Sequence, residues 1–199
     1  MGYDKDFYLM YQDYLTEPNV RASHNWIFAI AKLNSNFQNV VDFGCGAFNE
    51  FSVYGKPQSY LGIDINAAPE ANRKLVKADY RNAGNLTELI GHKSFHTAFV
   101  SLFSTEITAY KQENYKFYER VFKELSTINS GLVSGFYYAN KKDINPLGET
   151  GGLLSYQTLE NPEDISSSLF TEKRIILPVP SKMFGQDVFE VWKFFDRKI

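Results

Sequence analysis

Two short apolar runs, each followed by a carboxylate or a glycine turn, constrain the fold of this chain more than any other feature. The first covers residues 40–43 and leads into Gly44 and Gly46; the second covers residues 60–65 and carries Asp64 near its end. Such runs are typical of buried strands in a parallel sheet. Glycines after one strand let the backbone approach a ligand, and an acid at the tip of the next is placed to accept hydrogen bonds from ribose hydroxyls. The pair therefore predicts a sheet edge that binds a nucleoside.

The composition is that of a globular protein and argues against several classes of partner. Of the 199 residues, 44% are hydrophobic and 22% are charged, which suffices for one domain with a full core. The net charge of -2 gives no basic footprint for nucleic acid, and no apolar run approaches the roughly 20 residues of a membrane-spanning helix. A single cysteine excludes an internal disulfide framework and suits the cytoplasm. We therefore expect a cytoplasmic protein with no membrane partner, and the composition disfavours nucleic acid as its partner.

Strand patterns alternate with helical ones along the chain. Expected strands cover residues 39–43, 60–65, 75–79, 95–103 and 132–138, with a final pair at 173–180 and 187–195, and expected helices cover 18–34, 86–90 and 114–128. Thr16 is the expected cap of the first of these helices, with Pro18 in its first turn. Pro178 and Pro180 cannot donate ladder hydrogen bonds, which places their strand at a sheet edge.

This alternation predicts the fold class and the domain organisation. We expect an α/β protein, a three-layer sandwich with a mostly parallel seven-stranded sheet and a C-terminal antiparallel hairpin. Residues 1–199 form a single domain in this interpretation. Residues 1–34 supply N-terminal helices or a lid, and residues 39–199 supply the α/β core.

The motifs at the strand ends resemble those of the class I S-adenosylmethionine-dependent methyltransferases, which have a Rossmann-like fold. The family's acid followed by Gly-x-Gly is matched by Asp42, Gly44 and Gly46, and its ribose-binding acid by Asp64. The acid that meets the adenine amino group is matched by Asp79, with Tyr80 beside it. The resemblance also implies that the last strand of the sheet slips between the fifth and the sixth.

The resemblance implies S-adenosyl-L-methionine as the cofactor and a set of residues that bind it. Asp42 is expected near the amino group of the cofactor, and Arg21, on the helix before the first strand, against its carboxylate. Ser101 and Leu102 end the fourth strand, at the edge where ligands sit in such folds. The full predicted cofactor-binding set is Arg21, Asp42, Gly44, Cys45, Gly46, Asp64, Ile65, Asp79, Tyr80, Ser101 and Leu102.

The sequence departs from the family pattern at two places. It also departs from the glycine pattern of a rival fold, the dinucleotide-binding Rossmann fold. Phe48 stands where a third glycine is common, so its ring is expected to crowd the methionine moiety, and His96 replaces an acid at the start of the fourth strand. A dinucleotide-binding Rossmann protein requires Gly-x-Gly-x-x-Gly, and that pattern fails at Asn49.

Methyl transfer to an oxygen or nitrogen nucleophile can need a general base, for which His24 and Glu106 are the candidate catalytic residues. Aromatic faces can stabilise the cationic sulfonium, and the candidates are Tyr8, Tyr11, Tyr14 and Phe103. Residues 148–152 form a glycine-rich segment typical of a loop that closes over a site. His92 and His96 lie four apart without an evident third ligand, so we predict no metal site.

We therefore expect an enzyme that transfers a methyl group to a small-molecule acceptor. Three alternatives stay open from the sequence. A non-catalytic methyltransferase-like binding or scaffold protein would account for Phe48. A nucleic-acid or protein methyltransferase would need a basic patch beside the pocket. A Rossmann oxidoreductase would bind a nicotinamide cofactor in spite of the failed glycine pattern.

Overall fold

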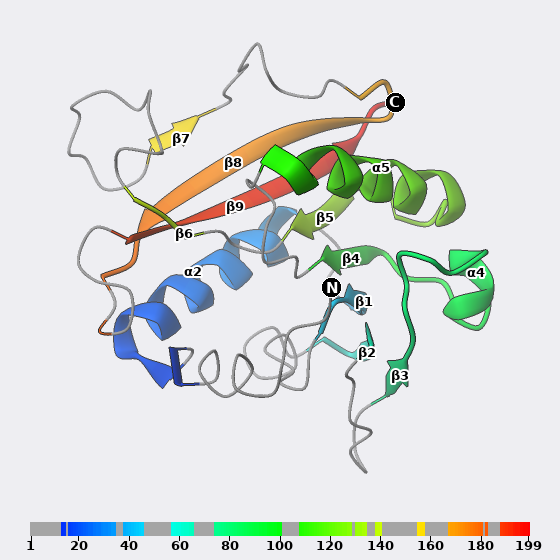
Figure 1. The fold of residues 1–199 in the computed structure, drawn as a ribbon, viewed down its shortest axis with the longest axis horizontal. Helices are drawn as coiled ribbons and strands as arrows, with labels where there is room; N and C mark the ends of the chain where they lie inside the picture. Colours follow the sequence, from blue (N-terminus) through cyan, green and yellow to red (C-terminus); the bar gives the residue numbers. More distant parts are fainter. Residues whose placement is uncertain are drawn as a thin grey trace.

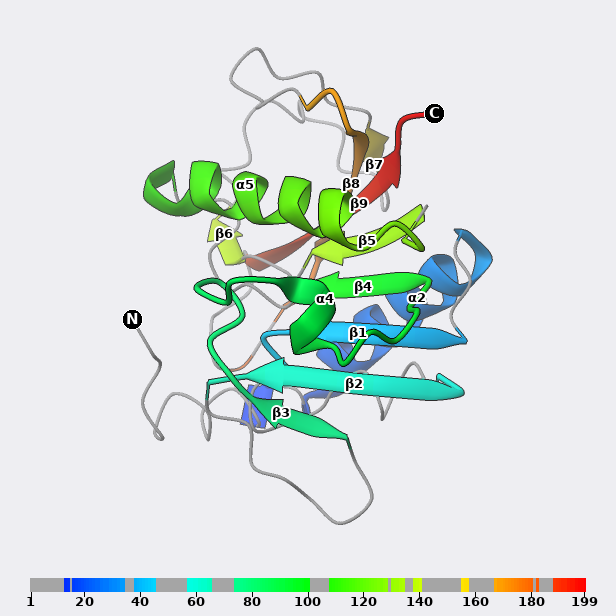
Figure 2. The same ribbon diagram turned by 90° about the vertical axis from the view of Figure 1, so that its right-hand side faces the viewer.

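The computed structural model describes residues 13–14, 16–34, 38–45, 57–65, 74–100, 108–128, 130–134, 138–140, 155–157, 167–180, 182 and 188–199. This part of the chain forms one sheet with helices on both of its faces (Figures 1 and 2). The helices are α2 (Pro18–Asn34), α4 (Leu86–Leu89) and α5 (Thr108–Glu124). The strands are β1 (Asn39–Phe43), β2 (Ser59–Asp64), β3 (Leu75–Lys77), β4 (Thr97–Val100), β5 (Ser130–Ser134), β6 (Tyr138–Asn140), β7 (Ser155–Gln157), β8 (Phe170–Pro178) and β9 (Val188–Arg197).

The strand order of the sheet is β3-β2-β1-β4-β5-β9-β8-β7, with β6 pairing to β9. Four parallel pairings join β3, β2, β1, β4 and β5, and the remaining pairings are antiparallel. The last strand along the sequence, β9, lies between β5 and β8. The mostly parallel order and the closing hairpin are therefore confirmed.

The predicted number of seven strands was wrong, because the described residues contain nine. The two unexpected strands are β6 and β7, each of three residues. Segments this short cannot show a clear alternation of apolar and polar residues, so their pairing depends on the neighbouring strand. The strand of Pro178 was expected at the sheet edge, but β7 lies outside it and pairs with residues 174–176 of β8; Pro178 itself lies beyond that pairing.

Helix α2 covers one face of the sheet through its apolar side (Figure 2). Val20, Ile27 and Phe28 are buried, and the Phe28 ring lies 5.8 Å from that of Phe99 and 6.2 Å from that of Trp192. The helix begins with Pro18 because this residue has no N–H that needs a partner. Thr16 does not cap it, since its hydroxyl donates backward to the Asp13 carbonyl at 2.7 Å.

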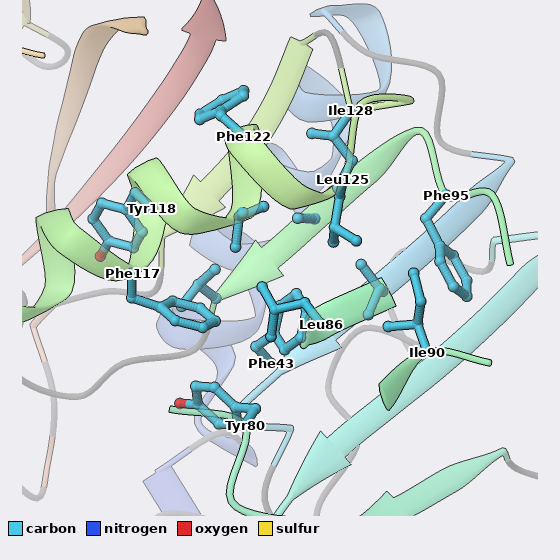
Figure 3. Close-up of a cluster of buried hydrophobic side chains, with 14 of the residues drawn as sticks. Phe43, Tyr80, Leu86, Ile90, Phe95, Phe117, Tyr118, Phe122, Leu125 and Ile128 are labelled. Carbon is cyan, nitrogen blue, oxygen red and sulfur yellow. The ribbon is translucent and has the colours of Figure 1, made fainter. Parts of the chain in front are cut away.

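Helices α4 and α5 cover the opposite face and enclose the larger part of the core (Figures 2 and 3). Val41 and Phe43 of β1 point toward these helices, since they belong to the same buried cluster as the apolar face of α5. By the alternation of a strand, Val40 and Asp42 face the other way, toward the α2 side. The cluster also contains Leu61, Ile63, Leu86, Ile90, Phe95, Phe117, Tyr118, Val121, Phe122, Leu125 and Phe195.

The helices and the parallel strands share one orientation that determines where a ligand can bind. β1, β2 and β4 all end at the same edge of the sheet, and α2 and α5 begin on that side (Figure 2). Ligands of open α/β sheets bind outside this carboxyl edge. No helix in the described part of the chain has the length and apolar character needed to cross a bilayer.

Candidate functional site at the carboxyl edge

The end of β1 combines a buried carboxylate with a turn that requires glycine. Asp42 is only 2% exposed. Gly44 has a φ of +83°, a conformation that side chains with a Cβ rarely adopt. Its N–H donates to the Ile63 carbonyl of β2 at 2.8 Å, so the turn is held against the neighbouring strand. Asp42 thus lies near the end of β1 and Gly44 in the turn after it, as the strand pattern predicted.

The hydroxyl of Tyr60 on β2 donates a hydrogen bond to Oδ2 of Asp42 at 2.6 Å. The register pairs Val40 with Tyr60 and Asp42 with Gly62, so all four residues lie on the α2 side of the sheet. A Cβ built on Gly62 would lie 2.7 Å from Leu75 Cδ2, 2.8 Å from Cys45 Sγ and 3.0 Å from Tyr60 Oη. Because Gly62 has no side chain, the Tyr60 side chain can extend past it to reach Asp42. The sequence reasoning missed Tyr60, because the contact depends on strand register.

Cys45 follows the glycine turn and is buried. Burial raises the pKa of its thiol, and the nearby charges of Asp42 and Asp64 raise it further. The thiol therefore stays protonated at neutral pH and is a poor nucleophile. Its place beside Gly62 makes it a small packing residue at the centre of the predicted site.

Asp64 is the last residue of β2 and is 7% exposed, while Ile65 beyond it is 37% exposed. Its main-chain carbonyl accepts a hydrogen bond from the Ala78 N–H at 3.0 Å, which fixes the chain after β3 against the end of β2. A second mostly buried carboxylate therefore follows Asp42 along the same edge. Such a pair is costly to bury unless hydrogen-bond donors or cations meet it.

The chain after β3 forms a turn whose two predicted site residues have different surroundings. Asp79 is exposed and its carboxylate accepts hydrogen bonds from the Asn82 side chain at 2.8 Å and from the Arg81 and Asn82 main-chain N–H groups. The hydrogen bond from the Asn82 side chain is the main cause that lowers the pKa of Asp79. Tyr80 is buried, and its ring centroid lies 5.5 Å from that of Phe43 and 5.1 Å from that of Phe117 (Figure 3). Burial raises its pKa.

Helix α5 holds this turn through a clamp made by Arg120 and Glu124. The Arg120 guanidinium donates to the carbonyls of Ala83 at 2.5 Å and Arg81 at 3.3 Å, and to Glu124 Oε1 at 2.5 Å. The other carboxylate oxygen of Glu124 accepts the Leu86 N–H at 2.6 Å. No local sequence signal marks this contact, because its partners are 37 to 39 residues apart.

The predicted residues of α2 have contrasting environments. Arg21 is exposed. His24 is fully buried, with its ring edge-on to Trp192 of β9 at 5.2 Å, and Tyr14 before the helix is also buried. His24 thus packs between α2 and the sheet, which is the surrounding of a core residue; its role as a base stays a prediction.

The remaining predicted residues lie outside the described part of the chain. They are Gly46, Phe48, Ser101, Leu102, Glu106, Tyr8, Tyr11, Phe103 and the segment 148–152. Among the described residues, no three His, Cys, Asp or Glu side chains come together as metal ligands. Asn39 Nδ2 lies 3.3 Å from His96 Nδ1, and His92 is exposed.

An open hollow of about 430 Å³ lies at the start of α2 and not at the ends of β1 and β2. Its lining residues are Asp13, Thr16, Glu17, Pro18 and Lys182. The Lys182 N–H donates to Glu17 Oε2 at 2.8 Å, and Asn19 Nδ2 donates to the Pro180 carbonyl at 3.2 Å. The hollow therefore marks where the chain beyond β8 docks on the helix.

No protein-family model and no curated protein matches the chain. Among solved structures, it is similar to a Streptococcus mutans protein crystallised with SAH, with a TM-score of 0.43 and 12% identity over 90% of this chain and 99% of that one. It is also similar to an rRNA methylase of Streptococcus thermophilus (TM-score 0.44, 11% identity, 92% and 99% covered). Phosphoethanolamine N-methyltransferase 1 of Haemonchus contortus, in complex with phosphoethanolamine and S-adenosylhomocysteine, gives a TM-score of 0.44 and 13% identity over 94% of this chain and 44% of that one.

These similarities are distant, and the strand order says more about the fold than they do. The described sheet places β9 between β5 and β8, next to five strands joined in parallel in the order β3-β2-β1-β4-β5. The position of the last strand between the fifth strand and the outer part of the sheet is the one that the resemblance of the motifs implied. The chain has an α/β fold with a mostly parallel sheet and an antiparallel hairpin.

Proposed function

We propose that this protein is an S-adenosylmethionine-dependent methyltransferase that acts on a small molecule. The observation that carries the proposal is the pair of mostly buried carboxylates, Asp42 and Asp64, at the ends of adjacent parallel strands beside the Gly44 turn. S-adenosylmethionine offers such a pair both a cationic amino group and a ribose diol.

The residues present fit this cofactor in their chemistry. Asp64 is proposed to accept hydrogen bonds from the ribose hydroxyls, and Asp42 to lie near the amino group. The turn at Asp79 and Tyr80, held by the Arg120 clamp, is proposed to bind the adenine. The Gly44 turn leaves space for the close approach of the backbone to the ligand.

The chemistry that S-adenosylmethionine supplies when bound is the transfer of its sulfonium methyl group to a nucleophile in line with the sulfur. The protein's part in such a reaction is alignment of the two reactants and exclusion of water. The buried aromatic rings of Phe43, Tyr80 and Phe117 support a dry wall on the α5 side of this edge. His24 and Glu106 remain the candidate bases, and the net charge of -2 supports a small-molecule acceptor over nucleic acid.

Calorimetric titration with S-adenosylmethionine and S-adenosylhomocysteine tests the proposal, with a nicotinamide dinucleotide as the ligand control. We expect micromolar binding of both sulfur nucleosides and none of the dinucleotide. Asp64→Asn should weaken binding roughly 10- to 100-fold, since hydrogen bonds to a charged acceptor are lost. Asp196→Asn is the matched control, because Asp196 is partly exposed and pairs with Lys173 on β8. Absence of binding by the wild-type protein, or full binding by Asp64→Asn, would refute the proposal.

A further inference from the structure

We infer that Tyr60 is a positioning residue of the candidate site, which holds the Asp42 carboxylate for the amino-acid end of the ligand. This inference rests on the proposed function and goes beyond it, because Tyr60 is not among the residues that were predicted to bind the cofactor. The hydroxyl of Tyr60 donates to Oδ2 of Asp42 at 2.6 Å. A short hydrogen bond to a charged acceptor is among the stronger kinds in proteins.

The geometry around this hydrogen bond is built by the two strands. Val40 pairs with Tyr60 and Asp42 pairs with Gly62, so the tyrosine must reach two residues along the strand to meet the acid. Gly62 permits this, because a Cβ there would lie 3.0 Å from the tyrosine oxygen and closer still to Cys45 Sγ and Leu75 Cδ2. The space above Gly62 is therefore shared by three side chains that must fit together.

The burial of Asp42 explains why its orientation should matter to a ligand. Asp42 is 2% exposed, so its carboxylate cannot turn into bulk water to find another hydrogen-bond donor. A donor on one oxygen fixes the plane of the carboxylate in advance, and prior positioning of a binding group strengthens association. A cationic amino group would then meet an acid that is already oriented.

Removal of the hydroxyl should affect one end of the ligand and leave the other unchanged. S-adenosylhomocysteine carries the amino-acid end, whereas 5′-methylthioadenosine has the same nucleoside without it. Tyr60→Phe should weaken binding of S-adenosylhomocysteine roughly tenfold and leave the affinity for methylthioadenosine within about twofold. A merely structural role of Tyr60 would weaken both ligands alike.

The experiment is calorimetric titration of the wild-type protein, Tyr60→Phe and Tyr118→Phe with both ligands, together with thermal unfolding of each protein. Tyr118 is a matched control, since it is buried on α5, on the other face of the sheet, and packs on Phe195. If the phenylalanine variant does not fold, Tyr60→Met provides the same comparison with a more flexible apolar side chain.

The outcomes separate this inference from the function on which it rests. Failure of the wild-type protein to bind either ligand would refute the proposed function and the inference with it. Binding of both ligands by the wild-type protein, with an unchanged affinity ratio in the Tyr60 variant, would refute the inference alone. A selective loss for S-adenosylhomocysteine in the Tyr60 variant and no loss in Tyr118→Phe would establish it.

Discussion

The Arg120 guanidinium on α5 donates a hydrogen bond to the main-chain carbonyl of Ala83, 2.5 Å away, and so ties the helix to the turn that carries Asp79. Arg120→Ala removes this bond and leaves the buried part of Glu124 without its salt-bridge partner. We expect the free energy of unfolding to fall by about 1–3 kcal/mol in urea denaturation. Arg120→Lys keeps the charge but cannot present the planar fork, so it should recover only part of the loss. Equal stability of all three proteins would show that the clamp contributes nothing.

A Gly62→Ala substitution should destabilise the fold through overpacking. The new Cβ would lie 2.7 Å from Leu75 Cδ2 and 2.8 Å from Cys45 Sγ, so at least one neighbour must move. The expected loss is about 1–3 kcal/mol of unfolding free energy. Gly84→Ala is the control, because nothing lies within 4 Å of a Cβ at that position. A thermal unfolding midpoint for Gly62→Ala as high as that of Gly84→Ala would contradict the packing.

The thiol of Cys45 should react slowly with alkylating reagents in the folded protein. Its pKa is raised by burial, so the thiolate stays scarce even where an ordinary thiol, with a pKa of about 8.5, is ionised. Alkylation followed by mass spectrometry should therefore show little modification at pH 9, and rapid modification once urea unfolds the chain. Fast reaction of the native protein would place the thiol in a more polar setting.

The raised pKa of the Cys45 thiol should also make the free energy of unfolding depend on pH. Because the folded thiol keeps its proton while the unfolded thiol loses it, this contribution is complete below about pH 8.5 and declines as the pH rises above that value. Cys45→Ala removes the effect. Urea denaturation at pH 7.5 and 9.5 should thus show a larger drop in unfolding free energy for the wild-type protein than for Cys45→Ala.

Lys193 is fully buried on β9, where its ammonium lies 3.6 Å from Glu172 Oε1 and 3.4 Å from the Tyr115 hydroxyl. Lys193→Met would leave Glu172 without this cation in a mostly buried place. We expect a loss of about 3–5 kcal/mol in unfolding free energy. Adding Glu172→Gln to Lys193→Met should restore part of the loss, since the uncompensated charge is gone. A double variant no more stable than the single one would contradict this account.

His24 should behave as a packing residue in stability measurements. Its ring is edge-on to Trp192 at 5.2 Å, so His24→Ala leaves a cavity that we expect to cost about 2–4 kcal/mol. His24→Phe keeps an aromatic ring and should recover most of this. The chain has two tryptophans, so a Trp26→Phe background isolates Trp192. Its fluorescence should shift to the red in His24→Ala, and an unchanged spectrum would argue against the contact.

The core strands could be predicted because a strand that is buried on both faces is a continuous run of apolar residues in the sequence. Residues 39–43 are the strand β1 as predicted, and β2 is displaced by one residue. The helix expected at 114–128 spans Thr108–Glu124, since its first turns lack the apolar period that marks the rest. Leu125 and Ile128 continue the pattern beyond the helix end because both are buried in the turn that follows.

Some residues of the candidate site could likewise be predicted from the sequence, and others could not. Asp42 and Asp64 could be expected at the same edge of the sheet, since parallel strands end at one edge. Tyr60 and Arg120 could not be found, because the contacts of each depend on register or on packing between distant segments. Asp79 was expected to end a strand over residues 75–79, but β3 ends at Lys77 and Asp79 lies in the loop beyond it, where its hydrogen bonds to Asn82 depend on the folded chain.

The position of β9 bears on how the chain can fold during synthesis. A ribosome releases β1 to β5 first, and these strands can pair with one another as they emerge. Among the strands that precede it, β8 pairs only with the three-residue β7, because its neighbour on the inner side is β9, which emerges about ten residues later. The pair of β7 and β8 therefore cannot join β5 until β9 is made, and an early halt of translation would leave β5 with an open, aggregation-prone edge.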